Sequence, residues 1–315
     1  MPRHAPLMKI YKCKELGANV IVEGKDISVS KQLALKMAKE NQGKYINGYD
    51  MVDVLAGAGT VAEEIFNQVS DVDAILTPVG GGGLVAATCV AARALSPKTK
   101  VFGFVPETCP SMLKSLEAGK PVFTRCKPTL ADGLAVPLVG VNSFHTMKGI
   151  HVPLLHMFNT TILSILLNTG IHSDIIYKVL PVKESDIAVG ILRLLETEKV
   201  VAEGAGAISA SALLAGSLHE LAGKKVVCII SGGNIDTTMV GRCIEKGLAA
   251  DSRLIKFETM ISDRPGGLAE LAKITAETGA SIKHLAMVSG VFFSFVSFEL
   301  RTRSHFKIPS EDFFF

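Results

Sequence analysis

The stretch Thr77-Pro78-Val79-Gly80-Gly81-Gly82-Gly83-Leu84 decides the fold, because it joins a short apolar run to an alanine-rich segment. The apolar run Ala74-Ile75-Leu76 predicts a buried strand, and residues 84–95 predict a helix. Four consecutive glycines carry a high entropic cost, which a merely flexible turn rarely requires. Without β-carbons, their backbone amides can point into one small volume at the positive end of a helix. The stretch therefore favours a phosphate-binding loop, with a flexible turn as the alternative.

Strands and helices alternate along most of the chain. Further β-like runs occupy residues 18–22, 100–105 and 226–230, and helices are expected near residues 32–40, 111–117, 186–195 and 205–214. Ser30 is placed to cap the first of these helices. The alternation predicts an α/β fold, in which helices cover both faces of a parallel sheet. Ligands bind beyond the carboxyl ends of strands in such sheets, so strand-to-helix junctions are the candidate sites.

A second glycine-rich junction, Ser231-Gly232-Gly233-Asn234, directly follows the apolar run at residues 226–230. Glycines there let a planar ligand approach the backbone, and Ser231 offers a neutral hydroxyl group. The alternative is a tight turn at the start of a helix, with Ser231 or Asn234 as its cap.

A third junction contains Gly57, Gly59 and Ala62, which fit the dinucleotide-binding pattern GxGxxA. That pattern requires an acidic residue at the end of the next strand, where this chain has Thr77-Pro78. The sequence therefore disfavours a dinucleotide site.

The composition is that of an ordinary globular protein: 315 residues, 48% hydrophobic and 20% charged, with a net charge of +3. This charge is too small and too scattered to indicate binding to nucleic acid or to an anionic membrane. The chain is long enough for one large two-lobed domain or two ordinary ones. Residues 150–171 are rich in apolar side chains, but Pro153, His151 and Asn159 interrupt them, so a membrane span is disfavoured.

The six cysteines show neither close pairing nor a CxxC motif. Cys89 and Cys228 lie in apolar runs and are expected to be small core residues. This pattern predicts a reducing, cytoplasmic compartment, with neither a disulfide framework nor a zinc site.

Eight segments, taken in chain order, match a single family: residues 1–6, 16–20, 56–60, 78–84, 115–121, 130–136, 203–207 and 231–236. Together they resemble the threonine/serine dehydratases (ammonia-lyases) and serine racemases among the fold type II, tryptophan-synthase-β-like pyridoxal-phosphate enzymes. That fold is an α/β arrangement of open, twisted parallel sheets with helices on both faces. The run Gly80 to Gly83 points to a dehydratase or racemase, because related cysteine synthases usually carry threonines in this loop.

The resemblance implies pyridoxal 5'-phosphate as the cofactor and assigns its binding residues. Gly80, Gly81, Gly82, Gly83 and the amide of Leu84 are expected to hold the cofactor phosphate. Ser231 is expected to share a hydrogen bond with the pyridine nitrogen, and Glu203 to lie near the cofactor. A neutral partner leaves the ring less electron-withdrawing than a carboxylate would, which suits elimination.

Residues 254–258 and 263–268 resemble the first strand and helix of an ACT-type regulatory domain, a ferredoxin-type α+β fold. In that fold the strand-to-helix turn contributes to amino-acid effector sites, often at subunit interfaces. An ordinary strand–turn–helix is the alternative. The expected organisation is part of a smaller lobe at 1–48, a large cofactor-binding lobe at 49–250 with an insertion at 149–173, a partial ACT-like domain at 252–290 and an irregular tail at 291–315.

The sequence also departs from the family pattern. The Schiff-base lysine motif, Ser-(Phe/Tyr)-Lys-x-Arg-Gly, and the carboxylate-binding Ser-x-Gly-Asn-His loop are not found, and neither Lys9 nor Lys31 stands in a matching context. No catalytic residue is therefore assigned, and we expect an N-terminally truncated, incomplete coding sequence. Val105 stands where racemase-like relatives place a cation-binding Glu, so no metal is expected.

The resemblance implies a threonine/serine ammonia-lyase of amino-acid catabolism, which forms a 2-oxo acid and ammonia by β-elimination. The alternatives are a serine racemase-like enzyme, or a non-catalytic pseudoenzyme or fragment, which the missing lysine motif favours. The expected partners are threonine or serine as substrate, an amino-acid effector at the ACT-like segment and further copies of the chain in a homo-oligomer.

Overall fold

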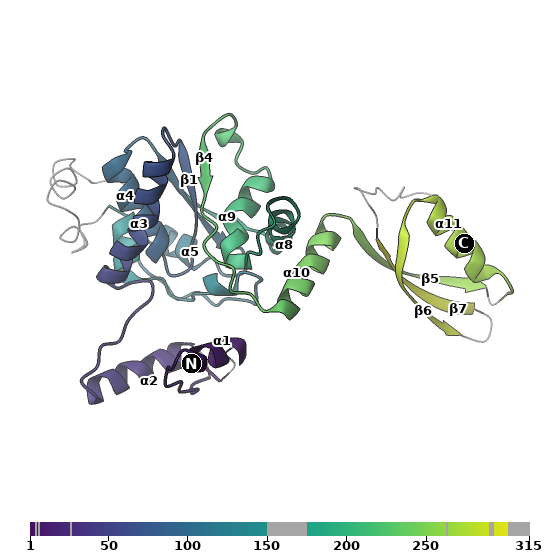
Figure 1. The fold of residues 1–315 in the computed structure, drawn as a ribbon, viewed down its shortest axis with the longest axis horizontal. Coiled ribbons are helices and arrows are strands. Elements are labelled where there is room, and N and C mark those ends of the chain that lie inside the picture. The colour runs from purple at the N-terminus through teal and green to yellow at the C-terminus, as the bar shows by residue number, and fades with distance from the viewer. Residues whose placement is uncertain are drawn as a thin grey trace.

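The computed structural model describes residues 1–301 except residues 4, 6, 26, 150–174, 263 and 290–292. These residues form a pair of N-terminal helices, a parallel sheet layered between helices, and a second, antiparallel sheet that follows α10 (Figure 1). The expected insertion at 149–173 and the apolar run at 150–171 lie outside the described residues, apart from Gly149. Among the helices that are described, none combines the length and apolar character needed to cross a bilayer.

The N-terminal part consists of α1 (Leu7–Glu15) and α2 (Ile27–Glu40). The strand predicted at residues 18–22 is wrong, because no described strand lies beside this run to complete a ladder. Instead, Met1 bonds to it at two points: its amino group donates to the Ile21 carbonyl at 2.6 Å, and its carbonyl accepts from the Glu23 amide at 2.8 Å. Ser30 does not cap α2, which begins three residues before it; its hydroxyl donates to the Glu23 carbonyl at 2.6 Å.

Four parallel strands form the central sheet, in the order β3-β2-β1-β4. They are β1 (Ala74–Pro78), β2 (Lys100–Pro106), β3 (Lys178–Val182) and β4 (Val226–Cys228). The predicted parallel sheet is confirmed. β4 is shorter than predicted, although the Ile229 amide still donates to the Leu76 carbonyl at 3.0 Å.

Helices cover both faces of this sheet, as predicted (Figure 1). One face carries α4 (Gly83–Leu95), α5 (Ser111–Ala118) and α6 (Val141–Met147), with α3 (Val52–Gln68) packed against α4. The other carries α8 (Glu184–Arg193), the π-helical turn η3 (Leu194–Glu198) and α9 (Gly204–Leu214), while α10 (Thr237–Ala250) packs on α8. Side chains of β2 alternate between the two cores: Phe102 and Phe104 pack on the α8–α9 side, and Val101 and Val105 on the α4 side.

The second sheet has three antiparallel strands in the order β5-β7-β6. It contains β5 (Leu254–Ser262), α11 (Gly267–Glu277), β6 (Ser281–Ser289) and β7 (Phe293–Arg301). The irregular tail expected from residue 291 is therefore wrong over β7. Val296, Phe298 and Leu300 alternate with polar residues and pack on Leu271 of α11, which is the period of a half-buried strand.

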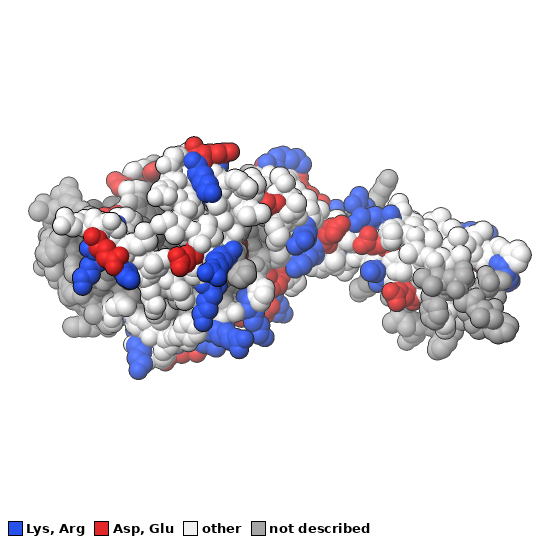
Figure 2. All heavy atoms as spheres, turned by 90° about the horizontal axis from the view of Figure 1, so that it is seen from below, with Lys and Arg blue, Asp and Glu red and all other residues white. Residues whose placement is uncertain are grey.

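A charge network joins the start of β5 to the large lobe. The Arg193 guanidinium at the end of α8 makes two hydrogen bonds to the Asp251 carboxylate, at 2.7 and 2.8 Å. Arg253 contacts both Asp251 and Glu196, at 3.4 and 2.8 Å. Elsewhere the charges are spread out: on the face shown in Figure 2, basic and acidic side chains are interspersed.

We expect Phe102→Ala to lower the free energy of unfolding by roughly 3–5 kcal/mol, because the side chain is fully buried and the cavity left behind cannot collapse completely. Urea unfolding measures this loss. Phe123→Ala is the control, since Phe123 is 70% exposed and its removal should change stability by less than about 0.5 kcal/mol. Equal losses in the two variants would contradict the assignment of Phe102 to the core.

Candidate functional site

The glycine loop lies between β1 and α4, at the carboxyl edge of the parallel sheet. Gly81, Gly82 and Gly83 are buried, and Gly82 caps α4 in the left-handed conformation, with φ at +98°. On either side of the loop the backbone is paired: the Val79 amide donates to Phe104 and the Ala86 amide donates to Gly82. Between them, the amides of Gly80 to Val85 find no hydrogen-bond acceptor among the described residues.

The arrangement of these amides suits the binding of a phosphate group. Buried backbone donors are almost always paired in folded proteins, so consecutive donors that find no acceptor among the described residues are suited to bind an anionic group. Their position at the N-terminus of α4 adds the positive end of the helix dipole. Phosphate oxygens supply several acceptors and negative charge in one small volume.

Glycine is required in this loop because other parts of the protein pack closely against its backbone. A β-carbon on Gly81 would overlap the ring of Tyr49, and one on Gly82 would lie 2.5 Å from Met112 Cε. One on Gly83 would lie 2.7 Å from the Tyr49 carbonyl oxygen. The side of the loop that carries the β-carbons is therefore filled by protein.

Ser231 follows β4, which pairs in parallel with β1 through Leu76 and Cys228. The Ser231 loop and the glycine loop consequently leave neighbouring strands at the same edge of the sheet. Ser231 is exposed, and its hydroxyl makes no hydrogen bond within the part of the chain that the structure describes.

The alternative role of Ser231 or Asn234 as a helix cap is wrong. Asp236 caps α10: its carboxylate accepts from the Thr238 amide at 2.8 Å and from the Thr238 hydroxyl at 2.7 Å. These bonds hold the pKa of the Asp236 carboxyl below its ordinary value. The glycine-rich turn before α10 therefore has no capping task.

Glu203 precedes α9, and its amide donates to the Gly232 carbonyl at 3.1 Å. Its carboxylate lies close to two glycines: a β-carbon would lie 2.9 Å from Oε1 if built on Gly232 and 3.8 Å if built on Gly133. Burial raises the pKa of the Glu203 carboxyl above its ordinary value, the nearby Asp132 adds to the rise, and Lys9 opposes it.

The short helix η1 (Asp132–Leu134) connects the glycine loop to Glu203. A β-carbon on Gly80 would lie 3.2 Å from Leu134 Cα and 3.3 Å from the Gly133 carbonyl oxygen. Asp132 also pairs with Lys9 of α1, at 3.6 Å between Nζ and Oδ2. The glycine loop, η1, Glu203 and the Ser231 loop thus form one continuous edge.

Sequence reasoning missed three features of this edge. It recognised residues 130–136 as a family segment but gave η1 no role, and it assigned nothing to Tyr49 or Lys9. The family segment at residues 130–136 is the one sequence signal that could have indicated a role for η1. Tyr49 and Lys9 contact residues far away in the sequence, so no local pattern indicates them.

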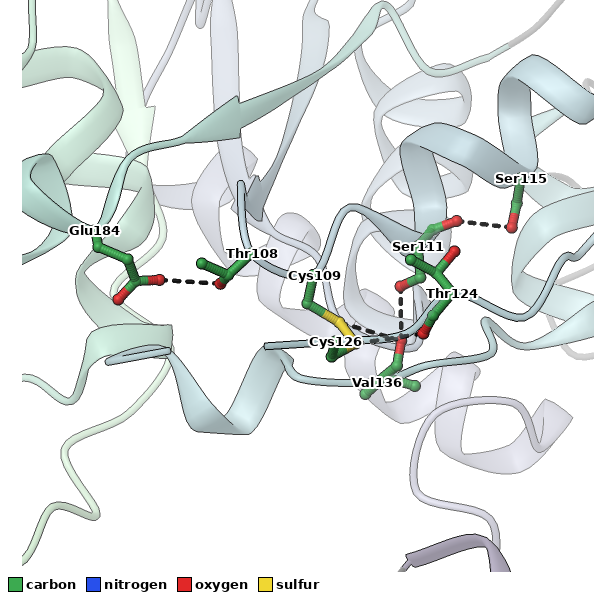
Figure 3. The surroundings of a disulfide bond; sticks show 8 residues. All are labelled: Thr108, Cys109, Ser111, Ser115, Thr124, Cys126, Val136 and Glu184. Carbon is green, nitrogen blue, oxygen red and sulfur yellow. Dashed lines mark hydrogen bonds between the residues drawn. A yellow bond between two sulfur atoms is a disulfide. The ribbon is translucent and has the colours of Figure 1, made fainter. Parts of the chain in front are cut away.

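The structure also pairs two of the cysteines, whose spacing had predicted no disulfide framework. Cys109, after β2, bonds to Cys126, with the two Cα atoms 4.4 Å apart (Figure 3). Seventeen residues separate them, so spacing alone did not reveal the pair. Nearby, the Ser111 hydroxyl donates to the Val136 carbonyl at 2.6 Å, which fixes the segment that leads out of η1.

The structure disfavours the dinucleotide site. Gly57 and Gly59 lie inside α3, which begins at Val52, so they form no strand-to-helix turn that could bind a dinucleotide. Val105 is fully buried in an apolar cluster. Within the described residues, no three His, Cys, Asp or Glu side chains gather as metal ligands would.

Comparisons with known proteins identify the family of the chain. Residues 1–232 match the family model described as "Pyridoxal-phosphate dependent enzyme". The chain is 39% identical over 282 residues to L-threonine ammonia-lyase of Thermotoga maritima and 35% identical to that of Geobacter sulfurreducens. Each alignment covers 90% of this chain, and the chain spans 64% of each relative's length.

Two solved structures are similar in fold. The processed form of threonine deaminase isoform 2 from Solanum lycopersicum has a TM-score of 0.62 and 28% identity, covering 78% of this chain and 65% of that one. Serine racemase from Dictyostelium discoideum has a TM-score of 0.61 and 29% identity, covering 75% and 67%.

The raised pKa of Glu203 predicts a pH-dependent cost in stability. The folded chain binds the Glu203 proton more tightly than the unfolded chain does. The bound proton therefore stabilises the fold fully at a pH below the pKa of Glu203 in the unfolded chain, and this stabilisation is lost as the pH rises through the pKa of Glu203 in the folded chain. We therefore expect Glu203→Gln to raise the melting temperature at pH 8, with a gain that disappears near pH 4. Glu198→Gln, at an exposed position, should show no such pH dependence; a pH-independent effect at Glu203 would refute the prediction.

Proposed function

Because the chain belongs to the family of pyridoxal-phosphate dependent enzymes, we propose that it is a threonine or serine ammonia-lyase, which forms a 2-oxo acid and ammonia. The observation that carries the proposal is the run of amides from Gly80 to Val85, which find no acceptor in the described part of the chain and lie at the positive end of α4. The names of the curated relatives support threonine as the substrate.

Each residue of the site has a task in this proposal. The amides of Gly80 to Gly83 and of Leu84 hold the cofactor phosphate, and Ser231 offers its hydroxyl to the ring nitrogen. The bound cofactor supplies an electron sink that acidifies the α-hydrogen of an amino acid. Glu203, with its raised pKa, holds a proton at higher pH than an exposed glutamate would. No described residue is assigned as the catalytic lysine.

A non-catalytic, cofactor-binding protein is the second candidate, because the family's lysine motif is not found in the sequence. One experiment separates the two. The protein is incubated with pyridoxal phosphate and then with L-threonine, and 2-oxobutanoate is measured. Formation of product supports the lyase, whereas saturable binding without product supports the second candidate. D-serine formed from L-serine would support a racemase instead, and failure to bind the cofactor would refute all three.

We extend the proposal to the organisation of the chain. Residues 1–48 are assigned to a smaller lobe, residues 49–250 to the cofactor-binding lobe, and residues 252–290 to a partial ACT-like regulatory domain that binds an amino-acid effector. The order β5-β7-β6, with α11 joining β5 to β6, supports the last assignment, since it is the order of the first three strands of a ferredoxin-type fold.

A homo-oligomer and a cytoplasmic location complete the proposal. In a reducing cytosol, Cys109 and Cys126 would be present as two thiols. Light scattering tests the oligomer, and cell fractionation tests the location.

We expect Gly82→Ala to weaken pyridoxal-phosphate binding at least about tenfold. The left-handed backbone costs alanine roughly 1–2 kcal/mol, and the new methyl group meets Met112, so the loop must shift and misplace its amides. Fluorescence titration gives the Kd. Gly119→Ala is the matched control: Gly119 also has a positive φ, +68°, but nothing lies within 4 Å of the added carbon. Equal weakening in both variants would contradict a cradle at Gly82.

A further inference from the structure

Tyr49 and Asp50 make a set of long-range hydrogen bonds that no role described above explains. The Asp50 carboxylate accepts from the amides of Val141 and Ser143, each at 3.0 Å, at the start of α6. The Asp50 carbonyl accepts from the Asn142 side chain at 2.8 Å, and the Tyr49 carbonyl accepts from the Ser143 hydroxyl at 2.7 Å. More than ninety residues of sequence separate the partners. The dipeptide therefore fixes where α6 begins.

Gly140, the residue before α6, connects the start of this helix to the glycine loop. The Gly140 amide donates to the Gly81 carbonyl at 2.9 Å. Gly140 itself is packed against Asp50 so closely that an added β-carbon would overlap the carboxylate. A fixed Asp50 thus fixes Gly140, and through it the carbonyl of Gly81.

A fixed carbonyl determines the direction of the next amide. In a planar trans peptide, the carbonyl of Gly81 and the N–H of Gly82 point to opposite sides. The hydrogen bond from Gly140 therefore turns the Gly82 N–H away from α6. In the same way, the bond from Ala86 to the Gly82 carbonyl turns the Gly83 N–H toward the N-terminal side of α4.

Tyr49 packs directly on the loop, on the side where β-carbons would lie. Its ring lies against Gly81, and its backbone lies against Gly83, where a β-carbon would be 3.0 Å from Tyr49 Cα. The Tyr49 hydroxyl makes no hydrogen bond to any residue that the structure describes. The ring therefore acts here through its shape and contact.

We propose that Tyr49 and Asp50 are positioning residues, which hold the amides of the glycine loop in the arrangement that binds the cofactor phosphate. The inference rests on the proposed function of this loop. It assigns a role to two residues through their contacts with the glycine loop and with the start of α6.

The test compares Asp50→Ala and Asp50→Asn with the control Asp53→Ala. Asp53 is close in sequence, but its carboxylate is exposed and makes an ion pair only with Lys44 at 3.7 Å among the described residues. The Kd is measured for pyridoxal phosphate and for inorganic phosphate, well below the melting temperature of each variant. Inorganic phosphate reports on the amides without any contribution from Ser231.

We expect Asp50→Ala to raise both Kd values at least about tenfold, and Asp50→Asn to restore part of the loss, since its amide oxygen still accepts one hydrogen bond. Asp53→Ala should bind as the unchanged protein does. A second pair keeps the proposal testable if Asp50→Ala does not fold: Tyr49→Phe should keep the affinity, and Tyr49→Ala should lose it.

One outcome would refute the positioning role, and a different outcome would refute the proposed function. If the unchanged protein binds both probes and folded Asp50→Ala binds them equally well, with only a lower melting temperature, the positioning role is wrong. If the unchanged protein binds neither probe, the proposed function fails instead.

Discussion

A row of backbone donors that find no acceptor among the described residues is the constraint on which the rest of the site depends. The loop from Gly80 to Gly83 runs between Tyr49, Met112 and Leu134, so the bulk of the protein packs on its β-carbon side. Water is excluded from much of the loop, and the start of α4 leaves its first amides unpaired by construction. An unpaired buried donor costs about 1–3 kcal/mol, so an anionic ligand that pairs several of these amides at once is strongly favoured.

The parallel sheet brings the remaining groups to this loop. β4 lies beside β1 in register, so the turn with Ser231 leaves the sheet next to the glycine loop. Glu203 then reaches the same edge, because the start of α9 is bonded to the backbone of Gly232. A one-residue slip of β4 would move the serine turn along the edge and reverse the faces of its side chains. The site is consequently as well defined as the strand register.

The sequence predicted those parts whose determinants are local. The apolar run before the glycines and the alanine-rich segment after them were enough for β1 and α4, and the alternation of elements was enough for the parallel sheet. Other features depend on partners distant in sequence. Residues 18–22 have strand propensity, but no described strand lies beside them. Cys126 lies 17 positions after Cys109, and β7 is a strand because Val296, Phe298 and Leu300 pack on α11. Tyr49 and Asp50 were missed for the same reason, since α6 begins more than ninety residues later.

Packing on the loop also changes what its glycines signify. Four glycines are first understood as room for a ligand, yet each β-carbon position is occupied or crowded by the protein itself. Gly81 permits contact with the Tyr49 ring, and Gly82 permits a positive φ. Neither requirement depends on a bound phosphate. What indicates the ligand is the opposite side of the same peptides, where the amides find no acceptor among the described residues. Glycine content and anion binding are therefore coupled through backbone geometry: only a chain without β-carbons can be clamped this closely on one side and still present consecutive N–H groups on the other.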